Sequence, residues 1–237
     1  MAVFCLFGGL MKKITFHSEI AYLIGLMLTA IGNALVSRAD FGMSMVVAPS
    51  YILHVKISEW LPFYSFGMSG YIFQGMLVIL TAIIVRRFRL SYLFSFVTAV
   101  IFGIFLDIAL IPASLIPSDT LTARIILMAV GLAIVPAGVS LLFNTYISPE
   151  AYELLVKEVS KKYTLSPGLM KTVYDVSSLI LALILSAVFF GFDNLVGIGV
   201  ATVIAAILNG PLISLYIKMY NRLFEFKDIF SFRNKFE

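Results

Sequence analysis

The chain alternates long apolar runs with shorter polar links, and six of the runs are long enough to cross a bilayer as helices. A spanning helix needs about 20 mostly apolar residues. The runs lack the apolar–polar alternation of a membrane barrel, so strands are not expected. The sequence therefore predicts an all-α polytopic protein with one membrane domain over residues 1–237. Its predicted spans are Ile20–Val36, Met68–Val85, Ser91–Ile111, Ile125–Phe143, Thr172–Phe190 and Leu195–Ile217.

Two links, 37–67 and 144–171, are long enough to hold helices of their own. Ser148-Pro149-Glu150 combines a capping serine, a proline in the first turn and an acid near the positive end of a helix. Beyond it two acid–lysine pairs stand at i,i+4 in the favourable order, Glu153 with Lys157 and Glu158 with Lys162. We expect an amphipathic helix in the membrane interface, or equally a surface helix packed on the bundle ends. The more apolar Ser44–Lys56 is a candidate re-entrant half-helix.

Composition supports the membrane prediction and excludes other classes. Apolar and aromatic residues make up 61% of the chain and charged residues only 13%, which no soluble domain of this length could bury. A single cysteine, Cys5, excludes an internal disulfide and a multi-cysteine metal cluster.

The basic residues predict the orientation. Fourteen of the 17 lysines and arginines fall on the side that holds both predicted termini. The positive-inside rule then places both termini in the cytoplasm of a multi-pass plasma-membrane protein. The net charge of +4 is thus explained by topology and contact with membrane lipids, and no nucleic-acid partner is expected.

The first ten residues fit no span. Val3–Leu10 is apolar but too short to cross a membrane, and it precedes Lys12 and Lys13, the reverse of a signal peptide. Either Met1 or Met11 could be the natural start, and residues 1–10 are expected to be dispensable for folding.

The two halves of the chain resemble each other, as repeat 1 over about 20–116 and repeat 2 over about 124–217. Gly25–Leu35 aligns with Gly131–Leu141, and Leu93–Ile111 aligns with Leu195–Ile213, which sets Asp107 opposite Asn209. Each half has three spans, an odd number, so the repeats must be inverted in the membrane. Inverted repeats are common in transporters, with sites near the repeat interface. A duplicated scaffold without transport is the alternative.

Short glycine-based motifs resemble those of the YczE/YyaS/YitT-type bacterial membrane proteins. They are Gly32-Asn33-Ala34-Leu35 through Phe41-Gly42, Lys171-Thr172-Val173-Tyr174-Asp175, and Gly197-Ile198-Gly199 through Asn209-Gly210-Pro211 in the last span. The resemblance covers most of residues 20–217 and implies a multi-pass plasma-membrane protein. It supplies no catalytic residues.

Polar residues within the spans are the candidate site, because such groups need a partner or a water-filled cavity. By depth they form an outer cluster and an inner cluster, on opposite sides of the midplane. The outer cluster comprises Asn33, Gln74 and Asp107, with Arg38 and Asp40 just above; the inner comprises Lys171, Asp175 and Asn209, with Asn144 nearby. We expect the clusters to be the two ends of a substrate or ion path. The alternative is helix–helix hydrogen bonding, worth about 0.6 kcal/mol per bond.

Two features of the inner cluster have two interpretations each. Lys171 and Asp175, at i,i+4, either bind substrate or form a local ion pair that eases burial. Pro211 removes the hydrogen bond to the Ile207 carbonyl, so Asn209-Gly210-Pro211 is either a broken helix that coordinates a ligand or a packing kink.

Enzyme motifs are incomplete, and no enzymatic activity is expected. Gly67-Met68-Ser69-Gly70 fits a rhomboid-type serine protease, but no histidine follows it in the chain to act as the base. Asp107 and Asp175 could form an aspartyl dyad only if they approached within about 3 Å, which their predicted depths forbid. No cofactor or metal site is predicted.

The sequence therefore predicts a small secondary transporter or exporter that works by alternating access on an unknown small molecule or ion. The alternative is a non-transporting membrane component, either a substrate-binding subunit that needs an ATPase partner or a scaffold. A homo-oligomer is compatible with both hypotheses.

Overall fold

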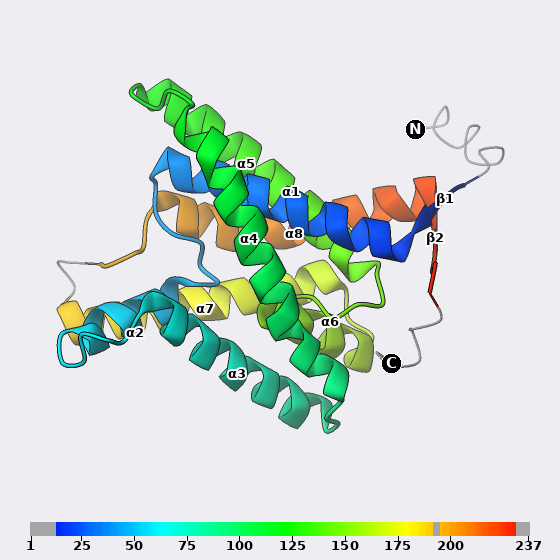
Figure 1. The fold of residues 1–237 in the computed structure, drawn as a ribbon, viewed down its shortest axis with the longest axis horizontal. Coiled ribbons are helices and arrows are strands. Elements are labelled where there is room, and N and C mark those ends of the chain that lie inside the picture. Colours follow the sequence, from blue (N-terminus) through cyan, green and yellow to red (C-terminus); the bar gives the residue numbers. More distant parts are fainter. Residues whose placement is uncertain (1–12, 192–194, 231–237) are drawn as a thin grey trace.

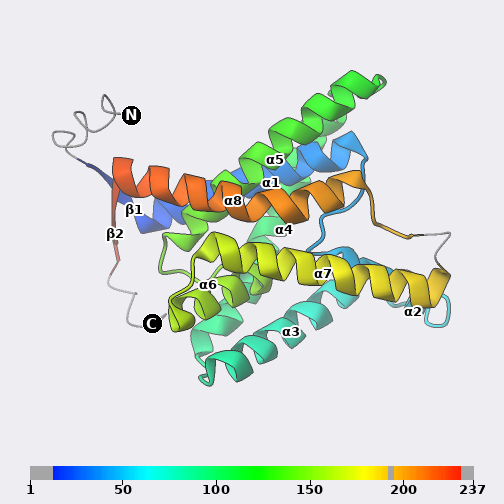
Figure 2. The same ribbon diagram turned by 180° about the vertical axis from the view of Figure 1, so that it is seen from behind.

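The computed structural model describes residues 13–191 and 195–230, and over these residues the protein is a helical bundle (Figures 1 and 2). The predictions for residues 1–10 and for the start at Met1 or Met11 lie outside the described residues. The elements in chain order are β1 (Ile14–His17), α1 (Ser18–Ala39), α2 (Ala48–Ser58), α3 (Phe66–Val85), the 3-10 helix η1 (Leu90–Leu93), α4 (Phe94–Ser114), α5 (Leu121–Phe143), α6 (Ala151–Tyr163), α7 (Pro167–Phe190), α8 (Val200–Leu223) and β2 (Phe224–Lys227).

The six predicted spans are confirmed as helices that are long and apolar enough to cross a membrane: α1, α3, η1 with α4, α5, α7 and α8. The predicted start of the last span is wrong. Gly197 has a φ of 74° and precedes a helix that begins only at Val200. The Gly197-Ile198-Gly199 motif lies in the connecting segment, where the Met43 backbone N–H donates to the Gly197 carbonyl over 3.2 Å. A side chain at Gly199 would overlap the carbonyl of Phe41.

The centre of the bundle is the antiparallel pair α1 and α5, which approach through glycines. A Cβ atom added to Gly138 would lie 2.6 Å from the Gly25 carbonyl, and one added to Gly131 would lie 2.7 Å from the Gly32 carbonyl. These glycines allow two helix backbones to meet where larger side chains would hold them apart.

The helix predicted after Ser148-Pro149-Glu150 is confirmed as α6, but its surface location is wrong. α6 packs against α3 and α7, and Ala151, Leu154 and Val156 are almost completely buried. The two predicted i,i+4 ion pairs do not form either. Glu153 and Glu158 pair with Lys171 and Arg89, whereas Lys157 and Lys162 donate to backbone carbonyls. These charges are therefore engaged by groups outside α6, in other helices and in the links.

The two predicted antiparallel hairpins differ. α7 and α8 pack together, with Gly168 of α7 against the Gly210 carbonyl of α8. α3 and α4 instead diverge from their connection as a V and make no extensive contact (Figure 1). Of the two interpretations of Asn209-Gly210-Pro211, the broken helix is wrong. α8 runs through Pro211 without interruption, and Gly210 serves close packing with α7.

A short parallel β-ladder joins the two ends of the described chain, contrary to the expectation of no strands. β1 pairs with β2 from Ile14 opposite Phe224 to His17 opposite Lys227. Phe16 packs against Phe224 with ring centroids 5.1 Å apart. The segment that enters the first span and the segment that leaves the last are therefore side by side. This agrees with an even number of spans, which places both ends of the bundle on the same side of the membrane.

Candidate functional site

The candidate site is a buried group of charged side chains where α6 meets α7, and Lys171 is at its centre. Lys171 lies one turn into α7 and is 2% exposed. Its Nζ is 2.9 Å from Oδ1 of Asp175, one helical turn further along. A second carboxylate, Oε1 of Glu153 on α6, lies 3.2 Å from the same Nζ. We call Lys171, Glu153, Asp175 and the neighbouring Glu150 the charge cluster.

The local sequence explains why this ammonium group stays inside. The four-residue spacing places Lys171 and Asp175 on the same face of α7. Glu153 stands in the first turn of α6, and the burial of α6 brings its carboxylate to the lysine. Breaking a buried pair of this kind typically costs about 3–5 kcal/mol, because it leaves an uncompensated charge.

Polar side chains from α8 and α3 border the charge cluster. Asn209 of α8 lies beside the Asp175 carboxylate, and Gln74 of α3 lies beside the Tyr152 hydroxyl of α6. Several buried oxygens here accept no hydrogen bond from the described part of the chain: Oδ1 of Asn209, Oε1 of Gln74, Oε2 of Glu153, the Tyr174 hydroxyl and both carboxylate oxygens of Asp175. Of these, Oδ1 of Asp175 still forms the ion pair with Lys171. Buried acceptors are rarely left without a partner. The site therefore has unused capacity to bind a proton, a cation or a hydrogen-bond donor.

Glu150 adds a third carboxyl group at the start of α6 and is only half-buried. Desolvation by the surrounding helices raises the pKa of Glu150 well above its usual range; the charge of Glu153 adds to this, and that of Lys171 opposes it. Tyr22 of α1 is within electrostatic reach of the same carboxyl. The Tyr22 hydroxyl is 2.7 Å from Oγ1 of Thr98, which donates to the Ser148 carbonyl over 2.7 Å. This chain of hydrogen bonds fixes the segment that carries Glu150.

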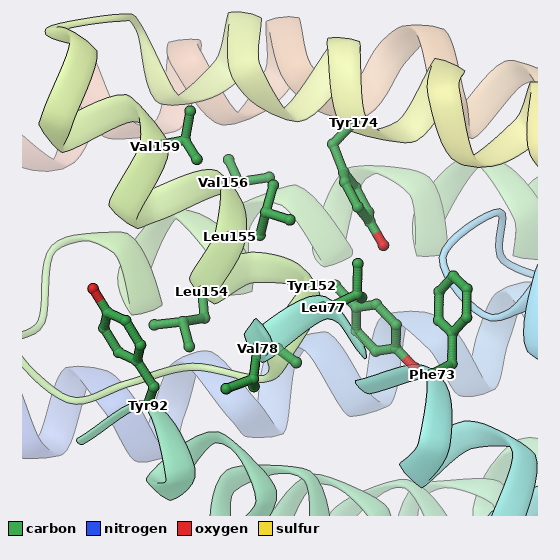
Figure 3. Close-up of a cluster of buried hydrophobic side chains, with 11 residues drawn as sticks. Phe73, Leu77, Val78, Tyr92, Tyr152, Leu154, Leu155, Val156, Val159 and Tyr174 are labelled. Carbon is green, nitrogen blue, oxygen red and sulfur yellow. The ribbon is translucent and has the colours of Figure 1, made fainter. Parts of the chain in front are cut away.

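Buried apolar and aromatic side chains of α3, α6 and α7 pack together (Figure 3). This group meets the charge cluster at Tyr174. Tyr152 of α6 and Tyr174 of α7 converge beside Phe73 of α3, and the Phe73 and Tyr152 ring centroids are 6.5 Å apart. The ring of Tyr174 also lies 5.4 Å from Nζ of Lys171, a cation–π distance. Desolvation and the charges of Glu150 and Glu153 raise the pKa of Tyr152, which keeps this hydroxyl protonated.

The predicted inner cluster is only partly correct as a grouping. Lys171, Asp175 and Asn209 do come together, and the predicted ion pair is present. Asn144, however, donates to the Ser140 carbonyl of its own helix over 2.9 Å. It lines a different cavity of about 500 Å³ with Arg89, Lys157 and Glu158. Asn144 ends α5 and is held by the last turn of that helix, so it does not reach α7.

The predicted outer cluster does not form. Gln74 joins the charge cluster through Tyr152, because α6 penetrates the bundle. Asn33 donates to the Thr29 carbonyl of its own helix over 2.9 Å, so it links no helices. Asp107 is exposed on α4, and no hydrogen bond or ion pair to the described residues engages it. Position along a helix could be read from the sequence, whereas the direction in which each side chain points could not.

Arg38 lies apart from both groups, in a cavity of about 430 Å³ between the ends of α1, α4 and α5. Its Nε donates to the Ile116 carbonyl over 3.0 Å. Arg124 on the opposite wall donates to the Ala39 carbonyl over 2.8 Å and pairs with Asp40 at 3.3 Å. Both arginines are thus engaged with backbone carbonyls, which ties the links at this end to the bundle.

Glu150 and Glu153 are the site residues that sequence reasoning missed. Both were seen only as helix-start and surface residues, since acids near a helix N-terminus are expected there for electrostatic reasons. One feature of the sequence could have indicated that Glu153 is buried. Ala151, Leu154 and Leu155 place apolar side chains around Glu153, which is unusual for a solvated face.

Six apolar helices around an internal charge cluster define a multi-pass helical membrane protein. A family model described as "Family of unknown function (DUF6198)" matches residues 16–218, so the chain belongs to that family. No curated protein and no solved structure matches the chain.

Proposed function

We propose that the protein is a small secondary transporter that moves a cationic small molecule or ion across the plasma membrane by alternating access. The observation that carries the proposal is the charge cluster. Keeping ionisable groups inside a membrane bundle is expensive, and a well-packed apolar group would often be at least as stable. Three carboxyl groups facing one ammonium group leave an excess of negative charge that favours a cationic ligand.

Matched helix contacts support the inverted-repeat architecture. Under the repeat alignment α1, α2, α3 and α4 correspond to α5, α6, α7 and α8. The contact between α1 and α4 then corresponds to the contact between α5 and α8. The contact between α3 and α6 corresponds to that between α7 and α2, and the contact between α2 and α3 corresponds to that between α6 and α7. The glycines at the α1–α5 contact follow the same symmetry. Gly25 faces Gly138, and their repeat counterparts, Gly131 and Gly32, face each other. This is the pattern that a two-fold axis between inverted halves would produce.

One pair of contacts breaks this symmetry, and it bears on mechanism. α7 and α8 are packed, whereas the corresponding α3 and α4 diverge (Figure 1). In an alternating-access protein the two repeats exchange their arrangements between the two states. We infer that closing the α3–α4 hairpin and opening the α7–α8 hairpin would carry the protein to its opposite state. The positive-inside orientation would make the conformation described here the outward-facing one.

The second candidate function is a non-transporting membrane subunit, and the exposed face of α4 favours it. Val100, Ile104, Asp107 and Ile111 follow one another along an exposed stripe of this helix. A lone carboxylate in such a stripe would gain from a basic or polar partner helix. Co-purification of one stoichiometric protein through this face, lost in an Asp107→Leu variant, would favour the subunit over the transporter.

Reconstitution into liposomes tests the transporter proposal. A thermal-shift screen of the detergent-solubilised protein against small organic cations and inorganic cations would supply the solute. We expect the protein to accumulate that solute when a proton or sodium gradient is imposed, and protein-free vesicles not to. Glu59→Gln, on the exposed end of α2, is a matched control for carboxylate substitutions in the charge cluster. Equal solute uptake by empty and protein-containing vesicles under every gradient would refute the proposal.

A further inference from the structure

A cavity of about 500 Å³ lies at the end of the bundle where α5 stops and α6 leads into α7, and no residue of the charge cluster lines it. Cavities of this size commonly hold small ligands. Its charged lining consists of three cationic side chains and one carboxylate, a net charge of +2: Arg89, Lys157, Lys161 and Glu158. This excess of positive charge favours an anion, the opposite of the ligand that the charge cluster favours.

Arg89 brings hydrogen-bond donors to the cavity that the described part of the chain does not use. Its Nη1 is 3.5 Å from Oε2 of Glu158, and its guanidinium group makes no hydrogen bond to the described residues. The same carboxylate oxygen accepts a hydrogen bond from the Tyr92 hydroxyl over 2.8 Å, which holds Glu158 in place. A guanidinium group with unused N–H groups can bind an oxyanion through two parallel hydrogen bonds.

Ser160, in the last turn of α6, is an independent indication of a ligand. It lines the cavity and is 4% exposed, and its Oγ has no hydrogen-bond partner among the described residues. A serine inside a helix usually bonds back to the carbonyl one turn earlier, as Ser140 does to Pro136 over 2.6 Å. Buried hydroxyl groups rarely stay unpaired, and this one can donate to an anion in the cavity.

Lys157 is held in position before any ligand arrives. Its Nζ donates to the carbonyls of Thr145 and Ile147, over 2.6 Å and 3.0 Å, in the link that follows α5. Its side chain is therefore already ordered in the folded chain. An anion that binds beside this ammonium group does not have to immobilise a long flexible side chain, which favours binding.

We propose that this cavity binds a phosphate group, with charge supplied by Arg89 and Lys157 and a hydrogen bond by the Ser160 hydroxyl. A phosphate group offers oxygens in several directions, which suits donors that come from the link after α3 and from two turns of α6. Phospholipid headgroups and soluble phosphate compounds both carry this group. The positive-inside rule places this end of the bundle in the cytoplasm, where both are present. The inference does not depend on the proposed transport.

Thermal unfolding in detergent micelles tests the site with one probe for each source. Inorganic phosphate is compared with sodium chloride at equal ionic strength, and micelles doped with phosphatidylglycerol are compared with micelles doped with phosphatidylcholine. We expect at least one probe to raise the melting temperature by at least about 2 °C. An effect of inorganic phosphate alone identifies a soluble phosphate compound, and an effect of phosphatidylglycerol alone identifies a lipid headgroup. Effects of both show that the phosphate group itself is sufficient.

Two variants separate a phosphate site from general effects of charge. Arg89→Gln should weaken the affinity for the effective probe at least about tenfold, and Ser160→Ala about two- to tenfold. Ser160→Ala should not destabilise the ligand-free protein, because it removes a buried hydroxyl that has no partner among the described residues. Arg222→Gln, exposed near the end of α8, is the matched control and should keep the wild-type affinity.

The proposal is overturned if neither probe raises the melting temperature. It is also overturned if either Arg89→Gln or Ser160→Ala keeps the wild-type affinity, because the rise would then be the general stabilisation that strongly hydrated anions give or binding elsewhere on the basic surface. Each rise is measured within one variant, so a change in the stability of the ligand-free protein does not obscure it.

Discussion

Nζ of Lys171 and Oδ1 of Asp175 lie 2.9 Å apart inside the bundle, one turn from each other on α7. The local pair alone would be electrically neutral. Glu153 makes the difference, because α6 brings a second carboxylate to the same ammonium group from another helix. The site is therefore an assembly of two elements, and any relative movement of α6 and α7 would change its charge balance.

Lys171→Met should destabilise the protein by about 3–5 kcal/mol, because it leaves the Glu153 and Asp175 carboxylates unpaired in a dry environment. Unfolding in detergent with increasing denaturant would measure the loss. Lys56→Met is the control, since its pair with Glu59 is largely exposed and should be worth at most about 1 kcal/mol. Equal effects of the two substitutions would mean that the Lys171 environment is not dry.

Gly138→Ala should destabilise the protein by about 1–3 kcal/mol, because the new Cβ would lie 2.6 Å from the Gly25 carbonyl and force α1 and α5 apart. Gly103→Ala is the matched control within α4. A Cβ there has no neighbour within 4 Å, so better helix propensity should leave stability unchanged or raise it by up to about 1 kcal/mol. Thermal unfolding of both variants would compare them. A neutral Gly138→Ala would contradict the close α1–α5 contact.

Disulfide trapping can detect exchange between the two hairpins in a Cys5→Ser background. Ser166 and Ser214, whose Oγ atoms are 3.4 Å apart across α7 and α8, should cross-link readily as cysteines. Their repeat counterparts in the diverging α3–α4 hairpin are Ser65 and Pro112. As cysteines these should cross-link only during transport, since a disulfide needs Cα atoms within about 7 Å. Ready cross-linking of the second pair in the resting protein would contradict the asymmetry between the hairpins.

The predicted orientation is tested by reporter fusions at Lys56 and Arg87. Lys56 lies in α2, before the second span, and Arg87 lies in the link after it. We expect an outside signal at Lys56 and a cytoplasmic signal at Arg87. The same side for both positions would overturn the topology.

The spans could be predicted from the sequence because a bilayer imposes a length and a continuous apolar run on every crossing helix. The sequence also predicted that α6 is a helix but did not predict that α6 is buried. Its polar periodicity correctly predicted a helix, but a membrane-protein interior also accepts charged residues when their partners lie on other helices. The buried Glu153 of α6 pairs with Lys171, which follows α6 by a link and a turn, and no local pattern encodes that pairing.

Asp107 and Gln74 also show that the sequence does not give the neighbours of a polar side chain within a span. Both were placed by their depth along a helix, and depth alone gave one outer cluster. The rotation and tilt of α3 and α4 decide which neighbours a side chain meets, and these depend on packing across the whole bundle. Gln74 consequently meets Tyr152, whereas Asp107 faces outward. For Gly210 the sequence left a helix break and a packing position open, and its contact with Gly168 favours packing.

The most direct test of the transporter proposal is solute uptake by Asp175→Asn and Asp107→Asn variants in liposomes under an imposed gradient. Asp175→Asn preserves shape but removes a charge from the charge cluster, so it should abolish or uncouple transport. Its stability should rise or stay level, because a buried charge has gone and Lys171 keeps its pair with Glu153. Asp107→Asn, on the exposed face of α4, should transport at close to the wild-type rate. Wild-type uptake by Asp175→Asn would contradict the account and leave the charge cluster as a structural ion pair.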